Sequence, residues 1–218
     1  MRLLSDFRSA ALALFTGGLL VGSAAEAHPH IWVTSTSELV YAADGSVTGV
    51  RHAWTFDDMF SSHALLGIEA NTKGVYTREE LQSLAQFNIE VLKEHSYFTS
   101  LKASGKLTFE APIDYFLDYA GDRLTLHFTL PLETPIKSKS LLLEIVDPSY
   151  FIDFQMAKDH PVKLVGAPAG CEAWLARPIG NDRDRKMAQA ASEDSFREGG
   201  ANVSVGLLFE NKIMVECP

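Results

Sequence analysis

Strict alternation of apolar and polar residues between Leu124 and Leu130 is the feature that most constrains the fold of this chain. A period of two is typical of a β-strand that buries one face. Further strand-like runs at residues 141–146 and 150–154 are rich in aliphatic and aromatic residues, and an Asp-Pro turn separates them. The second half of the chain therefore predicts mainly antiparallel strands.

A β-hairpin is predicted near the start of the chain. Residues 31–41 and 47–56 are rich in β-branched and aromatic residues, and an Asp-Gly turn dipeptide lies between them. In the second strand His52 shares a face with apolar residues, because side chains two positions apart point to the same side of a sheet. His52 is therefore expected to point inward.

Helical periodicity interrupts the strands in the first half of the chain. Helices are predicted over residues 57–68 and 77–95, and Thr77 and Glu80 have the spacing of a capping box. A polar surface helix is predicted over residues 181–197. The expected fold class is α+β: a mainly antiparallel β-sheet with an inserted helix–loop–helix, which looks like a degenerate EF-hand, and a surface helix near the C-terminus.

The first 27 residues have the organisation of a secretory signal peptide. An apolar run at residues 10–21 is followed by the small-x-small pattern Ala25-Glu26-Ala27. Residues 28–218 are then expected to form a single periplasmic α+β domain, in which residues 57–95 are the helical insertion. No later apolar run approaches the ~18–20 residues of a bilayer-spanning helix, so no transmembrane segment is expected in the mature chain.

Charge and motifs give no support to two classes of function. The formal net charge is −9, whereas nucleic-acid-binding surfaces are rich in Lys and Arg, so no nucleic acid partner is expected. The sequence has no GxSxG, HExxH or P-loop pattern. We therefore expect a binding protein and not an enzyme.

Cys171 and Cys217 are the two cysteines of the chain. In an oxidising compartment they are expected to form a disulfide that ties the C-terminus to the body of the domain. The alternative is a pair of thiolate metal ligands, but the two residues lack CxxC spacing.

Cleavage after Ala27 would place His28 at the mature N-terminus, two residues before His30. The free α-amine and two imidazoles would then lie within three residues, and such nitrogen ligands suit transition metals. Pro29 has no amide hydrogen, which excludes the N-terminal copper or nickel mode that uses deprotonated amides. A histidine brace, side-chain ligands completed by the folded body, and a polar N-terminus without an ion all stay open.

His52 and His127 lie on predicted strands and are the candidates to complete a metal shell with His28 and His30. For each of them alone, a structural histidine held by hydrogen bonds is the alternative. Asp57 is a possible oxygen ligand, and it also begins a predicted helix, where a carboxylate favours the helix dipole.

Residues 69–80 resemble a calcium-binding EF-hand loop. The residues at ligand positions are Glu69, Asn71, Thr77 and Glu80. A lysine at the fifth position places a positive charge where an oxygen ligand is needed, so we expect this loop to keep the EF-hand shape without calcium.

Several motifs occur together in the mature chain. They are His28-Pro29-His30-Ile31-Trp32-Val33, Arg51-His52-x-Trp54-Thr55-Phe56-Asp57, Leu126-His127-Phe128-Thr129-Leu130-Pro131-Leu132, Asp147-Pro148-x-Tyr150-Phe151 and Gly170-Cys171. In this combination the chain resembles a proteobacterial family of exported proteins of unknown function, usually labelled as the periplasmic component of an ABC-type transport system. The resemblance implies an association with transition-metal transport. Family members often carry an Asp-rich version of the calcium-like loop, from which Glu69 and Lys73 depart.

The predicted function is a periplasmic metal-binding accessory protein of a metal transport system. It would hold Zn, Ni, Co or Cu through His28 and His30 and exchange the ion with an inner-membrane metal transporter, since imidazole suits all four ions. One alternative is an interaction module without metal that docks to a transporter. A second alternative is a histidine-brace copper oxygenase.

Overall fold

A computed structural model of the chain describes residues 29–176, 178–190 and 205–218. Its strands are β1 (Ile31–Tyr41), β2 (Val47–Phe56), β3 (Thr99–Lys102), β4 (Ile113–Ala120), β5 (Arg123–Ile136), β6 (Ser140–Ile145), β7 (Ile152–Met156), β8 (Val162–Val165), β9 (Glu172–Ala176) and β10 (Asn211–Glu216). Its helices are α1 (Asp58–Ala64), α2 (Gln82–Glu94) and α3 (Asp182–Ala190), with the short 3-10 helices η1 (Ser96–Phe98) and η2 (Val205–Phe209). Within these ranges, no helix has the length and apolar character needed to cross a membrane.

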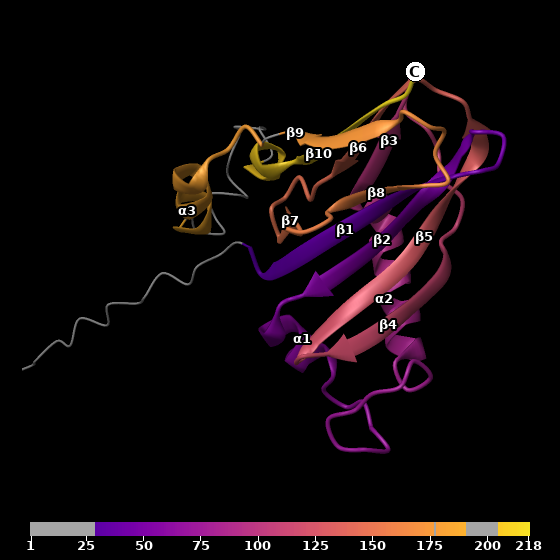
Figure 1. Cartoon of the computed structure of the whole chain (residues 1–218). Helices are drawn as coiled ribbons and strands as arrows, with labels where there is room; N and C mark the ends of the chain where they lie inside the picture. The colour runs from indigo at the N-terminus through magenta and orange to yellow at the C-terminus, as the bar shows by residue number, and fades with distance from the viewer. Residues whose placement is uncertain (1–28, 177, 191–204) are drawn as a thin grey trace, which may run out of the picture.

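The strands form two sheets. The main sheet has the order β4-β5-β2-β1-β7, with β8 also paired to β1, and the second sheet has the order β3-β6-β10-β9. Only β7 and β8 run parallel to their described neighbour, β1; the other pairs are antiparallel. Figure 1 shows the second sheet at one end of the molecule and α1 and α2 toward the other. The α+β class with mainly antiparallel sheets is thus confirmed.

β1 and β2 form the predicted hairpin, and β5 pairs with the other side of β2. In this register Ser37 lies opposite His52, and His52 lies opposite Phe128. All three side chains are buried, as the alternating pattern predicts. His52 therefore points into the interior.

One hydrophobic core cluster contains residues of both sheets, among them Leu126 from β5 and Leu143 from β6. Polar contacts also join the sheets: Thr99 Oγ1 in β3 lies 3.3 Å from His52 Nε2 in β2. The amide of Asn211 in β10 donates to the carbonyl oxygen of Phe154 in β7 at 2.8 Å. The inner faces of the two sheets therefore share one interior, while the outer face of the main sheet stays half-exposed.

The helices are shorter than the sequence predicts, because α1 ends at Ala64 and regular α2 begins at Gln82. The predicted capping box is present just before α2: the Thr77 N–H donates to Glu80 Oε2 at 2.8 Å, and the Glu80 N–H donates to Thr77 Oγ1 at 3.3 Å. It caps a turn that leads into α2. Of the predicted surface helix, α3 forms the described part, and residues 191–197 lie outside the described residues.

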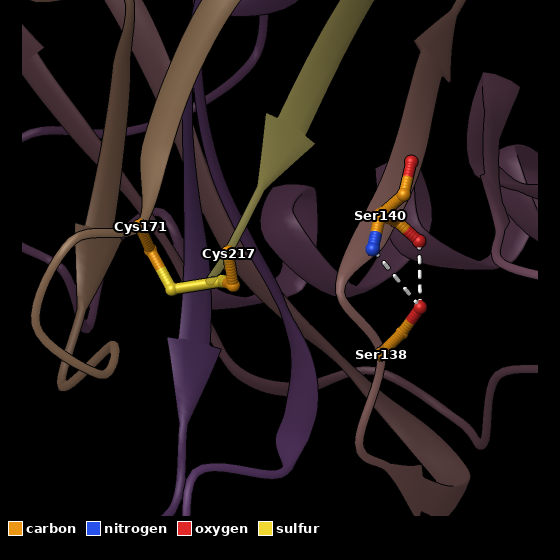
Figure 2. Close-up of a disulfide and its surroundings, with 4 residues drawn as sticks. All are labelled: Ser138, Ser140, Cys171 and Cys217. Carbon is orange, nitrogen blue, oxygen red and sulfur yellow. Dashed lines mark hydrogen bonds between the residues drawn. A yellow bond between two sulfur atoms is a disulfide. The ribbon is translucent and has the colours of Figure 1, made fainter.

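The predicted disulfide between Cys171 and Cys217 is present (Figure 2). It lies at the open end of the β9–β10 pair, directly after Glu216 and before Glu172. The N–H of Cys217 also donates to the carbonyl oxygen of Lys139 at 2.7 Å. Figure 2 shows the neighbouring turn, in which Ser138 hydrogen-bonds with Ser140. The C-terminus is therefore tied to both neighbours of β10.

Candidate functional site: an apolar pocket

The predicted metal ligands do not form one cluster in the described part of the chain. His28 lies outside the described residues, and His52 pairs with Ser37, seven positions along β1 from His30. At the rise of a β-strand this separates His30 from His52 by roughly 20 Å. Within the described ranges, no group of three or more His, Cys, Asp or Glu side chains could hold a metal ion.

His52 has the contacts of the structural alternative. It is 1 % exposed, and its Nδ1 lies 2.9 Å from Ser37 Oγ while its Nε2 lies near Thr99 Oγ1. Burial lowers the pKa of His52 to about 3, so the imidazole is neutral at neutral pH. Both ring nitrogens are thus engaged in hydrogen bonds within the core.

His127 lies on the opposite face of the main sheet from His52. It pairs with Ala53, the neighbour of His52 along β2, and successive side chains of a strand point to opposite faces. Its ring stacks on Phe116 with the centroids 4.5 Å apart, and its Nε2 lies 3.4 Å from Asp118 Oδ2. Burial lowers the pKa of His127, and the Asp118 carboxylate opposes this effect. The sheet therefore keeps His52 and His127 apart.

His30 and Asp57 lie at the same end of the main sheet. The Asp57 carboxylate caps α1 by accepting from the Phe60 N–H at 2.8 Å, and it accepts from the N–H of Trp32 at 2.9 Å. His30 precedes β1 by one residue, and its ring lies beside that of Phe151 with the centroids 4.7 Å apart. Two of the predicted ligands are thus brought to one region.

The calcium-like loop is closed by its own hydrogen bonds. Glu80 Oε1 accepts from both the N–H and the side-chain amide of Asn71, each at 2.7 Å, while Oε2 bonds with the N–H of Thr77. Backbone donors, first of Thr77 and then of Asn71, lower the pKa of Glu80. Glu69 is exposed. The carboxylate at the final ligand position therefore bonds the loop itself.

An apolar pocket of about 430 Å³ lies in the described structure. Its walls are the inner face of β1 and β2, α1, α2 and the segment 147–152. The Trp and Phe side chains that line it are Trp54, Phe56, Phe60, Phe87, Phe98 and Phe151. The polar lining residues are Asn88, His95, Asp147 and Ser149. A pocket of this size with apolar walls and a few polar groups is typical of a small-molecule site.

Phe87, Val91 and Phe151 are large apolar residues of the lining that are exposed to solvent, and we call them the mouth of the pocket. These side chains are 62 %, 44 % and 44 % exposed, respectively. Exposed apolar residues that cluster around a concavity mark a binding surface, whereas isolated ones need no explanation. The mouth is therefore suited to admit an apolar group.

Two strained backbone segments border the pocket. Ser96, Tyr97 and Phe98 have φ values of 52°, 54° and 47°, and Tyr150 has a φ of 59°. Non-glycine residues in this left-handed region are strained, and aromatic residues rarely occupy it. Phe98 lines the pocket, and Tyr150 lies between the lining residues Ser149 and Phe151. Such strain concentrates at functional sites, which favours the pocket as the site of this protein.

One feature of the sequence indicates this pocket: a second apolar side on α2. α2 buries Ala85, Ile89 and Leu92 against the core, yet it also carries Phe87 and Val91 four residues apart on another side. A helix with two apolar sides has more apolar surface than one core contact requires. The second side faces the pocket.

The pocket and the motif-bearing strands fall within one continuous family match. Residues 12–217 match the family model DUF1007, described as a protein of unknown function. The chain belongs to this family. No curated protein matches the chain. The description of this family names no activity.

Proposed function

We propose that this chain is an exported, periplasmic protein that binds a small organic molecule in the apolar pocket, without catalysing a reaction. The observation that carries the proposal is the open pocket of about 430 Å³, lined by aromatic side chains and bordered by strained backbone. The Cys171–Cys217 disulfide supports export, because disulfides persist in oxidising compartments. This proposal develops the alternative of a binding module without metal.

Narrowing the mouth of the pocket should weaken binding of a neutral apolar probe. The Val91→Trp variant places a larger side chain at the mouth, so the affinity for N-phenylnaphthylamine should fall at least about tenfold, in line with the loss of well-packed apolar contacts. Lys93→Trp, at an exposed position of α2 outside the pocket lining, is the matched control and should bind normally. Fluorescence titration of the mature protein measures both. Equal affinities of the two variants, or no binding by the unsubstituted protein, would contradict the proposal.

A second candidate function is the predicted metal-binding accessory role in transport. It is supported by the placement of His30 and Asp57 at one end of the main sheet, where the chain enters β1 from His28. A site there would use the N-terminal imidazoles, with Asp57 as an oxygen ligand, to hold Zn, Ni, Co or Cu as cargo for an inner-membrane transporter.

Calorimetric titration tests the metal role with protein that has its native N-terminus at His28. One equivalent of at least one of the four ions should bind, and His30→Ala should weaken binding at least about tenfold through the loss of one imidazole ligand. His63→Ala, exposed on α1, is the matched control and should leave binding unchanged. Absence of binding of all four ions would remove this candidate.

A further inference from the structure

The walls of the pocket are rich in aromatic rings. Phe56 and Phe60 lie with their ring centroids 4.6 Å apart, and the His95 ring stacks on Phe98 at 5.0 Å. The face of an aromatic ring carries negative potential and attracts a cation, and several rings around one cavity form the cage that recognises alkylated ammonium groups. The lining is therefore suited to a positive charge as well as to an apolar body.

The Asp and Glu residues at the pocket and its mouth are not matched by a Lys or Arg in the described lining. Among the described residues that line the pocket, none is Lys or Arg, and Asp147 is a carboxylate that is 4 % exposed. Glu90 and Glu94 lie three residues after Phe87 and Val91 on α2, a spacing that makes them surface neighbours of the mouth. A cation would thus meet a buried carboxylate in the wall and two exposed ones near the entrance.

The hydrogen bonds of Asp147 limit the kind of cation. Its Oδ1 accepts from the N–H and the hydroxyl of Ser149 at 2.8 and 2.7 Å, and its Oδ2 accepts from the N–H of Ile152 at 2.9 Å. These donors stabilise the negative charge and occupy acceptor sites. A primary ammonium has three N–H donors, which the acceptor capacity left on Asp147 cannot satisfy alone. A fully alkylated ammonium has no N–H to satisfy.

Resting on the proposed small-molecule function, we propose that the ligand of this pocket is an alkylated organic cation, that is, an apolar body carrying a quaternary ammonium group. The aromatic walls contact the alkyl groups, and Asp147 supplies the compensating charge from the wall. Glu90 and Glu94 attract the cation to the mouth.

A pair of isosteric probes tests the charge directly. Benzyltrimethylammonium and neopentylbenzene have the same shape and differ in the replacement of the charged nitrogen by carbon. Competition with N-phenylnaphthylamine on the mature protein should give a dissociation constant at least about tenfold lower for the cation. Equal or tighter binding of the neutral probe, or no competition by either probe, overturns the cation proposal and leaves the small-molecule function standing. Failure of N-phenylnaphthylamine itself to bind overturns both.

Two variants at exposed positions of α2 test the preference of the pocket for the cation over its neutral isostere. Phe87→Leu retains an apolar side chain at the exposed mouth but removes an aromatic face, so the preference for the cation over its isostere should fall at least about threefold. Glu90→Gln/Glu94→Gln should weaken binding of the cation about threefold and leave binding of the neutral probe unchanged. Glu79→Gln/Glu110→Gln is the matched control, because it changes the net charge by the same amount. A preference unchanged in both test variants overturns the proposal.

Discussion

Lowering the pH from 6.5 toward 3 is expected to destabilise the folded chain through His52. In the unfolded chain His52 takes up a proton near its ordinary pKa of 6.5, whereas burial lowers the pKa to about 3 in the folded state. The unfolded state therefore binds more protons across this interval. The free energy of unfolding should fall by about 1 kcal/mol per pH unit from this group, a total of several kcal/mol. Above pH 6.5 this contribution is fully present.

Urea denaturation at a series of pH values between 7 and 5 measures the effect, and His52→Gln is the matched variant. Gln can still hydrogen-bond with Ser37 and Thr99, but it does not titrate. The part of the pH dependence of the free energy of unfolding that we assign to His52 should therefore be absent from this variant. Other groups, including His127, contribute equally to both proteins, and the difference in slope isolates His52. Identical slopes for the two proteins would contradict the assignment.

Removing the disulfide is expected to lower the free energy of unfolding by about 4 kcal/mol. Cys171 and Cys217 are 46 residues apart, and cross-linking a loop of this length restricts the unfolded chain by about that amount on the chain-entropy model. The Cys171→Ser/Cys217→Ser variant should therefore have a lower urea midpoint with a similar dependence of free energy on urea concentration.

Reductant provides the control for this experiment. It should shift the unsubstituted protein to the midpoint of the double variant and should not affect the double variant itself. Because β9 and β10 also pair through backbone hydrogen bonds, the native state should persist without the disulfide at moderate temperature. A loss below about 1 kcal/mol would show that the unfolded chain gains little freedom when the link is removed.

The strands of the hairpin and of β5 were predictable because one face of the main sheet is buried and the other is half-exposed. Each strand then has a period of two, and the inward position of His52 follows from that period. The helical boundaries were less predictable, because the residues from Thr77 to Leu81 form a capped turn with helical spacing before regular α2 begins. Sheet order could not be read from periodicity, since pairing partners such as β6 and β10 lie far apart in the sequence.

The pocket could not be predicted from motifs because its walls come from four separate segments. Ile31 and Val33 in β1, Trp54 in β2, Phe87 in α2 and the segment 147–152 meet only after the sheet has formed. The histidines are easily recognised in the sequence as candidate ligands. Which of them lie close together in space, however, depends on the geometry of the sheet. His52 and His127 are separated by the sheet itself, which residue type alone could not reveal.

Methyl NMR of the mature protein with N-phenylnaphthylamine tests the central claim, that a small molecule binds in the pocket between α2 and the main sheet. The account predicts shift changes and intermolecular contacts at the methyl groups of Ile31, Val91 and Ile152, which line the pocket. Methyl groups of Leu143 and Ile213, buried in the second sheet outside the lining, should be unaffected. Shifts confined to other surfaces, or no shifts at saturating probe, would contradict the account.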